Sequence, residues 1–93
     1  MATEAALESD LAVWPGEMLV EELEARGLSQ RQLAALMHRP AQAINEIARG
    51  KKALTAETVV ELERVLGIPA YLWLRMEARY RLALARQRFR ESA

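Results

Sequence analysis

Residues 29–50, which read SQRQLAALMHRPAQAINEIARG, contain the pattern that decides the fold. Ser29 and Gln32 have the spacing of a capping box, in which each side chain bonds the backbone of the other residue. This spacing predicts a helix over about residues 30–37. The helical periodicity is then interrupted for about three residues at His38-Arg39-Pro40, so the chain is expected to turn there.

A second short helix is predicted directly after this turn, over residues 41–49. Ile44 and Ile47 lie on one side of it and would face inward, and Gly50 is a residue that readily ends a helix. The stretch therefore predicts two short helices joined by a turn of three to four residues.

The flanking sequence predicts three further helices and no strand. One is expected over about residues 15–26, one from the capping residue Thr55 to Gly67, and one over about residues 70–88. No segment alternates polar and apolar residues with period two. The expected fold is all-α, a five-helix bundle with a longer C-terminal helix.

The length and composition predict one small domain held together by packing. The 93 residues suffice for one modest core, and the chain has no cysteine for a disulfide or a thiolate zinc site. Residues 1–13 are mostly small and acidic and are expected to form a flexible arm, with residues 14–93 as the domain. The N-terminus lacks the pattern of a signal peptide, and no apolar stretch approaches about 20 residues. We expect a cytoplasmic protein without a cofactor or a bound metal.

Charge is balanced overall but arranged in blocks. The chain has 13 basic and 13 acidic residues. Residues 1–24 carry seven acids and no base, residues 26–52 carry six bases against one glutamate, and residues 75–93 carry six arginines against two glutamates. The blocks predict separate surfaces for separate partners, and the alternative for any one block is a solvated helix face.

Two short helices with this spacing are typical of a DNA-reading unit, in which the second helix enters the major groove. Gln42 is the strongest candidate for base reading, because an amide can form two hydrogen bonds with adenine. Lys51 and Lys52 follow in the loop, where cations commonly contact phosphate. Asn45 and Glu46 either contact DNA or hydrogen-bond the turn and the next helix cap. The DNA-binding residues predicted from these two helices, the turn and the loop are Arg39, Gln42, Asn45, Arg49, Lys51 and Lys52.

Several short motifs along residues 14–85 carry a family resemblance. They are Pro15-Gly16-Glu17, Gly27-Leu28-Ser29-Gln30, Leu33-Ala34, Ile44-Asn45-Glu46-Ile47, Gly50-Lys51, Leu54-Thr55-Ala56-Glu57-Thr58, Leu66-Gly67 and Trp73-Leu74. Together they resemble the HigA antitoxins of the Xre, or lambda-repressor-like, helix-turn-helix superfamily. The segments Ile-Asn-Glu-Ile, Leu-Thr-Ala-Glu-Thr and Trp-Leu are the most specific.

The resemblance implies a lambda-repressor-like bundle and a DNA-binding transcriptional repressor. It implies a homodimer that binds a palindromic operator at its own promoter and neutralises a RelE-like ribonuclease toxin. It further implies that Gln30 contacts phosphate and that Ala41, Gln42 and Ala43 read bases.

The sequence departs from the family pattern in the turn and in the reading helix. His38 stands where glycine is usual, and Pro40 stands where a serine or threonine cap is common. The turn geometry and its capping hydrogen bond are therefore expected to differ. Two alanines at reading positions imply weak direct readout, through contacts with thymine methyl groups.

The last predicted helix carries a stripe of large side chains along one side. The stripe is longer than four short helices can cover, so part of it is expected at a dimer interface. Its residues are Trp73, Met76, Tyr80 and Leu84. The arginines that follow residue 74 are interpreted as a solvated face, as salt-bridge partners of the acidic N-terminus across subunits, or as a second nucleic-acid surface.

The acidic N-terminal block suits a basic partner. Ribonucleases that cut messenger RNA attract phosphates and are usually basic, so their inhibitor is expected to offer carboxylates. The predicted toxin contacts are Trp14, Glu17, Glu21 and Glu24.

An enzyme is not expected. The chain has no His-Glu-x-x-His motif, no glycine-rich phosphate loop and no cysteine nucleophile, and its one histidine, His38, is interpreted as a turn residue. Two alternatives to a complete repressor are the DNA-binding front end of a longer regulator fused to a metallopeptidase domain, and a protein-interaction module that no longer binds DNA.

Overall fold

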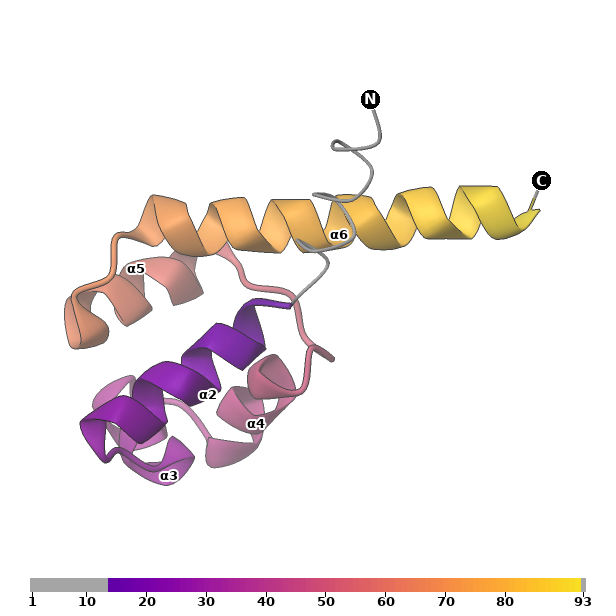
Figure 1. The fold of residues 1–93 in the computed structure, drawn as a ribbon. Coiled ribbons are helices and arrows are strands. Elements are labelled where there is room, and N and C mark those ends of the chain that lie inside the picture. The colour runs from indigo at the N-terminus through magenta and orange to yellow at the C-terminus, as the bar shows by residue number, and fades with distance from the viewer. Residues whose placement is uncertain (1–13, 93) are drawn as a thin grey trace.

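The structure of the chain is a computed structural model that describes residues 14–92. These residues form five helices and no strand, namely α2 (Pro15–Arg26), α3 (Gln30–Leu36), α4 (Ala41–Ala48), α5 (Ala56–Leu66) and α6 (Ala70–Ser92). The long helix α6 lies along one side of the four short ones (Figure 1). The prediction of an all-α five-helix bundle with a longer C-terminal helix is confirmed. The predicted arm, residues 1–13, lies outside the described residues.

The helix ends follow local hydrogen bonds that the sequence predicted. Ser29 Oγ accepts a hydrogen bond from the backbone N–H of Gln32 at 3.0 Å, and Gln32 Oε1 accepts one from the backbone N–H of Ser29 at 2.8 Å. Thr55 Oγ1 accepts from the backbone N–H of Thr58 at 3.2 Å in the same way. Gly27 ends α2 with a φ of 65°, in the left-handed region that glycine adopts without a steric cost. These ends are fixed by neighbours in sequence.

Helix α6 continues past its expected end near Arg88 to Ser92. No glycine or proline interrupts residues 70–92. Near the end, Gln87 Nε2 donates to Glu91 Oε1 at 3.2 Å, and the Ser92 hydroxyl donates to the carbonyl of Arg88 at 2.8 Å. The helix is thus extended by its own i,i+4 bonds. Among residues 14–92, no helix has the length and apolar character needed to cross a membrane.

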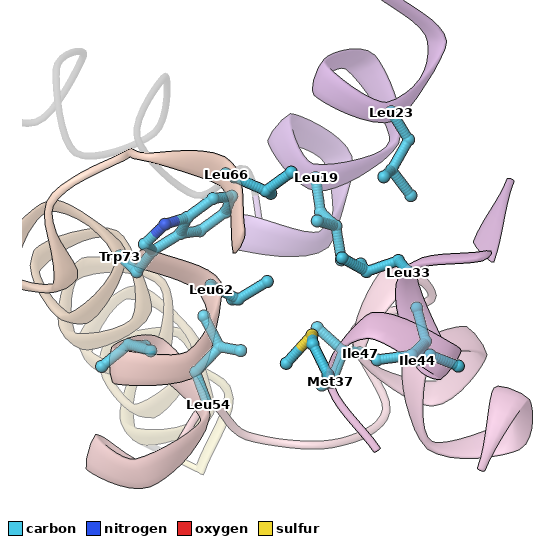
Figure 2. Packing of buried hydrophobic residues seen from close by; sticks show 12 residues of the cluster. Leu19, Leu23, Leu33, Met37, Ile44, Ile47, Leu54, Leu62, Leu66 and Trp73 are labelled. Carbon is cyan, nitrogen blue, oxygen red and sulfur yellow. The ribbon is translucent and has the colours of Figure 1, made fainter. Parts of the chain in front are cut away.

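One hydrophobic core lies between the helices and receives side chains from all five of them (Figure 2). Its buried members are Leu19, Leu23, Leu33, Ala34, Met37, Ile44, Ile47, Leu54, Val59, Leu62, Leu66 and Trp73. Burying each large side chain contributes roughly 1.5–3 kcal/mol to folding. Because α6 adds Trp73 to this core, the first part of α6 belongs to the same folding unit as the short helices.

Candidate nucleic-acid interface

Helices α3 and α4 pack against each other and are joined by the turn of residues 37–40. His38 has a φ of 54° and is the one non-glycine residue with a positive φ between residues 14 and 92. Its conformation explains why glycine would suit this position, because a Cβ atom makes the left-handed region costly. Pro40 precedes α4 and gives no side-chain capping bond, as its chemistry requires. Both differences expected in the turn are therefore seen. His38 has a left-handed backbone conformation, and α4 begins without a side-chain cap.

Helix α4 buries one face and leaves the other open. Ile44, Ile47 and Ala48 are buried in the core. The opposite face carries the predicted reading residues, with Ala43 half-buried at its edge, and its exposed members are Ala41, Gln42, Asn45 and Arg49. This face is small and polar, which is the composition that allows a helix to enter the major groove and pair with base edges.

The start of α2 fixes the C-terminal end of α4. Trp14 Nε1 donates a hydrogen bond to the carbonyl of Ala48 at 2.7 Å. A Cβ atom built on Gly16 would collide with the carbonyl oxygen of Ile47 and lie 2.6 Å from that of Ala48. Only glycine therefore permits this approach of the two helices. The Trp14 ring also lies against Gly50, where an added Cβ would sit 3.2 Å from ring carbons.

The sequence analysis missed the supporting roles of Trp14 and Gly16, since it predicts a helix from about residue 15, a family motif at Pro15-Gly16-Glu17 and a toxin contact at Trp14. A signal was present, because glycine in the first turn of a helix lowers helix propensity and often marks a close backbone approach. Trp14 is half-buried against its own chain. Its indole N–H is thus already bonded, and the predicted role as a toxin contact gains no support.

The structure brings together two predicted DNA contacts from different helices. Asn45 Nδ2 of α4 donates to Gln30 Oε1 of α3 at 3.2 Å. Sequence reasoning left open whether Asn45 contacts DNA or bonds the turn and the next helix cap, and the bond that forms instead joins the two helices. This bond uses the side-chain oxygen of Gln30 as its acceptor. A contact of Gln30 with phosphate would use its NH₂ group, which is a donor, so the two interactions need different atoms.

Arg39 differs from the other predicted DNA contacts because its guanidinium already forms a salt bridge within the chain. Arg39 Nη2 lies 2.6 Å from Glu61 Oε1 of α5, and Arg39 Nε donates to the same oxygen at 2.6 Å. This pair fastens the turn to α5. No local sequence pattern indicates this pair, because the two residues lie 22 positions apart.

Basic side chains border the exposed face of α4. Lys51 and Lys52 are exposed, and their backbone N–H groups donate to the carbonyl of Glu46 at 2.9 and 3.3 Å, so the loop that carries them is held to the helix end. Arg49 is exposed at the same end. Arg31 is a further exposed cation, in the first turn of α3 directly after Gln30, and sequence reasoning missed it although its place two residues after the capping residue was visible.

The structure places the residues predicted for protein partners in two different environments. Glu17, Glu21 and Glu24 are all exposed and form an i, i+4, i+7 row along α2.

Trp73, which was predicted at a dimer interface, is 0% exposed within its own chain. That part of the interface prediction is wrong, because the side chain is already covered by the core. The other members, Met76, Tyr80 and Leu84, are half-buried.

The comparisons with known proteins agree with this geometry. The model of the helix-turn-helix family HTH_3 matches residues 19–73. Virulence-associated protein I of Dichelobacter nodosus is 43% identical over 77 residues, which cover 82% of this chain and 71% of that protein.

Solved structures show the same likeness. An addiction module antidote protein of the HigA family from Coxiella burnetii is 28% identical with a TM-score of 0.79, over 86% of this chain and 88% of that one. The Pseudomonas aeruginosa antitoxin HigA, solved with the higBA promoter, is 27% identical with a TM-score of 0.80, over the same shares of the two chains. The chain therefore belongs to the Xre-like helix-turn-helix family of DNA-binding regulators, and its fold is that of the HigA-family antitoxins.

Proposed function

We propose that this protein is a sequence-specific transcriptional repressor that binds its own operator as a homodimer and serves as the antitoxin of a HigBA-type module. The observation that carries the proposal is the exposed face of α4, where Gln42, Asn45 and Arg49 stand clear of the core beside Lys51 and Lys52. The likeness to an antitoxin solved with promoter DNA supports it.

In this proposal the basic residues position the protein and α4 reads the sequence. Lys51, Lys52 and Arg49 neutralise phosphates, a contribution that falls with salt and does not depend on sequence. Gln42 pairs with an adenine edge, and Ala41 and Ala43 leave room for thymine methyl groups. The Gln30–Asn45 bond keeps the register of the two helices.

Footprinting on the DNA upstream of the protein's own gene tests the dimeric repressor. Two-fold symmetry of the protein has to match the periodicity of the groove, so two protected half-sites about one helical turn, ~34 Å, apart are expected. Protection of a single half-site at saturating protein would contradict the homodimer. Absence of any shift on that DNA would contradict autoregulation.

The proposed toxin is a RelE-like ribonuclease, and its proposed contact is the acidic row Glu17, Glu21 and Glu24 on α2. The row is exposed and lies on a different helix from the reading face of α4, so toxin and operator can be held together. Charge complementarity of this kind mainly raises the association rate.

Reversal of the three glutamates to lysine tests this contact. The association rate with the toxin should fall steeply at low salt, the loss should shrink as salt screens the field, and operator binding should persist. Reversal of Glu57 and Glu91, exposed on α5 and α6, is the control for added positive charge. If the triple variant neutralised the toxin normally while operator binding collapsed, the acidic row would be misassigned.

A further inference from the structure

The cations around α3 and α4 fall into two groups. Four of them are exposed and form no ion pair with any of the residues 14–92, namely Arg31, Arg49, Lys51 and Lys52. Arg39, in the turn between the two helices, is different. Its Nε and Nη2 both lie 2.6 Å from Oε1 of Glu61, and both side chains are half-buried. The turn that leads into α4 thus carries a cation whose charge is already neutralised.

A second carboxylate lies beside this pair. Arg39, Ala56, Glu57, Val60 and Glu61 line a shallow groove between the turn and α5. Glu57 and Glu61 are four residues apart, so they project from the same side of α5. The groove therefore sets two carboxylates against one guanidinium, and it does not attract phosphate while Arg39 lies in it.

The place of Arg39 in the chain would otherwise suit a phosphate contact. It lies two residues before Ala41, the first residue of α4 and the first of the proposed reading positions. The backbone N–H of Arg39 donates to the carbonyl of Ala34 at 2.9 Å, so the backbone of the turn is fixed. Only the side chain has to move for the guanidinium to leave α5.

We propose that Glu61 is a positioning residue that holds Arg39 on α5 and keeps this cation out of the DNA-binding surface. The inference rests on the proposed operator binding and names a residue that governs its strength. Phosphate contacts do not depend on sequence, so one more arginine among them would raise the affinity for all DNA. Glu61 thereby limits binding to unrelated DNA.

A transfer of Arg39 from Glu61 to DNA has a cost that the free cations do not have. It breaks two charge-assisted bonds to Glu61 and replaces them with bonds of the same kind to phosphate. It also leaves the Glu61 carboxylate unpaired beside Glu57 and near the negative charge of the DNA. Lys51 breaks no ion pair within the described residues when it binds phosphate. Arg39 therefore stays on α5 in the DNA complex.

Glu61→Ala tests the proposal through the salt dependence of DNA binding. The affinities for the operator and for unrelated DNA are measured over a range of salt concentrations. Both should rise about threefold at roughly 50 mM salt, and the plot of log affinity against log salt should steepen by about 0.9, as expected for one additional phosphate contact. The matched control is Glu57→Ala, which removes a carboxylate one helical turn away that forms no bond with Arg39. The control should leave the slope unchanged.

Two further variants show whether the effect acts through Arg39. Arg39→Ala should keep the wild-type slope, because the paired arginine makes no phosphate contact. Arg39→Ala/Glu61→Ala should lose the gain of Glu61→Ala. Lys51→Ala is the positive control and should flatten the slope by about 0.9. Circular dichroism checks the helix content of each variant, and Glu61→Gln, which keeps the shape of the side chain, replaces Glu61→Ala if that variant does not fold.

The possible results separate this inference from the proposed function. Operator binding by the wild type together with an unchanged slope or weaker binding in Glu61→Ala would overturn the role of Glu61 and spare the proposed function. A gain that persists in the double variant would assign the effect to the carboxylate alone and overturn the role of Arg39. A flattened slope in Arg39→Ala would show that Arg39 contacts phosphate in spite of the pair. A wild-type protein that binds no DNA would overturn the proposed function and this inference together.

Discussion

Helix α4 has eight residues and α6 has 23, yet the shorter helix is packed between two neighbouring helices whereas the longer one is packed only along its first part. An isolated helix of eight residues is unstable in water, so α4 depends on the contacts from α2 and α3. In α6, residues 86–92 are all exposed, and helical propensity with i,i+4 bonds maintains them. The difference shows that α4 is placed by tertiary contacts, whereas the end of α6 is placed by its own sequence.

The two helices also differ in what they expose. The open face of α4 is polar and bordered by cations, which suits a hydrated, charged ligand such as DNA. The open face of α6 is apolar, with Tyr71, Leu74, Leu82 and Phe89 exposed, which suits a protein surface. The same fold therefore offers one surface whose chemistry suits DNA and a second one whose chemistry suits a protein.

The largest expected effect on the free energy of unfolding distinguishes the first part of α6 from its last part. Trp73→Ala removes a fully buried indole and should lower the free energy of unfolding by about 3–5 kcal/mol. Phe89→Ala removes an exposed ring and should change it by no more than about 0.5 kcal/mol in the dilute monomer. Urea unfolding measures both variants. Equal losses would mean that the distal part of α6 belongs to the core.

A smaller effect should show how α4 is held. Gly16→Ala forces a Cβ atom against the carbonyls of Ile47 and Ala48, and overpacking of this kind costs about 1–3 kcal/mol. Gly27→Ala, with a φ of +65° and nothing within 4 Å, is the control and should cost about 1 kcal/mol through backbone strain. Under conditions where both variants are folded, only Gly16→Ala should weaken operator binding. Normal operator affinity in Gly16→Ala would show that α4 does not depend on this contact.

The smallest effect concerns the Trp14 hydrogen bond. Trp14→Phe keeps most of the ring but deletes the donor to Ala48, and the loss should be about 1 kcal/mol of unfolding free energy. Thermal unfolding provides the measurement, and toxin binding is measured beside it. An unchanged stability with weaker toxin binding would restore the role that the sequence suggested for Trp14.

The features predicted correctly are those that depend on residues close in sequence. The capping box of Ser29 and Gln32 and the Thr55 cap act over three residues, so their patterns are visible in the chain. The periodicity of α6 was also visible, but the pattern does not say which of its apolar residues face the core.

The features that were missed depend on contacts between distant residues. Trp14 and Ala48 lie 34 positions apart, and Arg39 and Glu61 lie 22 apart. Arg26 is a further case, because its Nη2 donates to the carbonyl of Leu66 at 2.7 Å, 40 positions away, and so supports the end of α5. No local pattern encodes such pairs, since they exist only after the bundle has formed.

A comparison of Gln42→Ala with Lys51→Ala tests whether the exposed face of α4 reads the operator. The affinities of both variants are measured on the operator, on single-base variants of each half-site and on unrelated DNA, over a range of salt concentrations. Gln42→Ala should lose roughly 1–3 kcal/mol of discrimination at one base position of each half-site, while Lys51→Ala should weaken all sequences alike and flatten the salt dependence. A Gln42→Ala variant with an unchanged ratio of specific to non-specific affinity would contradict the assignment of α4 as the recognition helix.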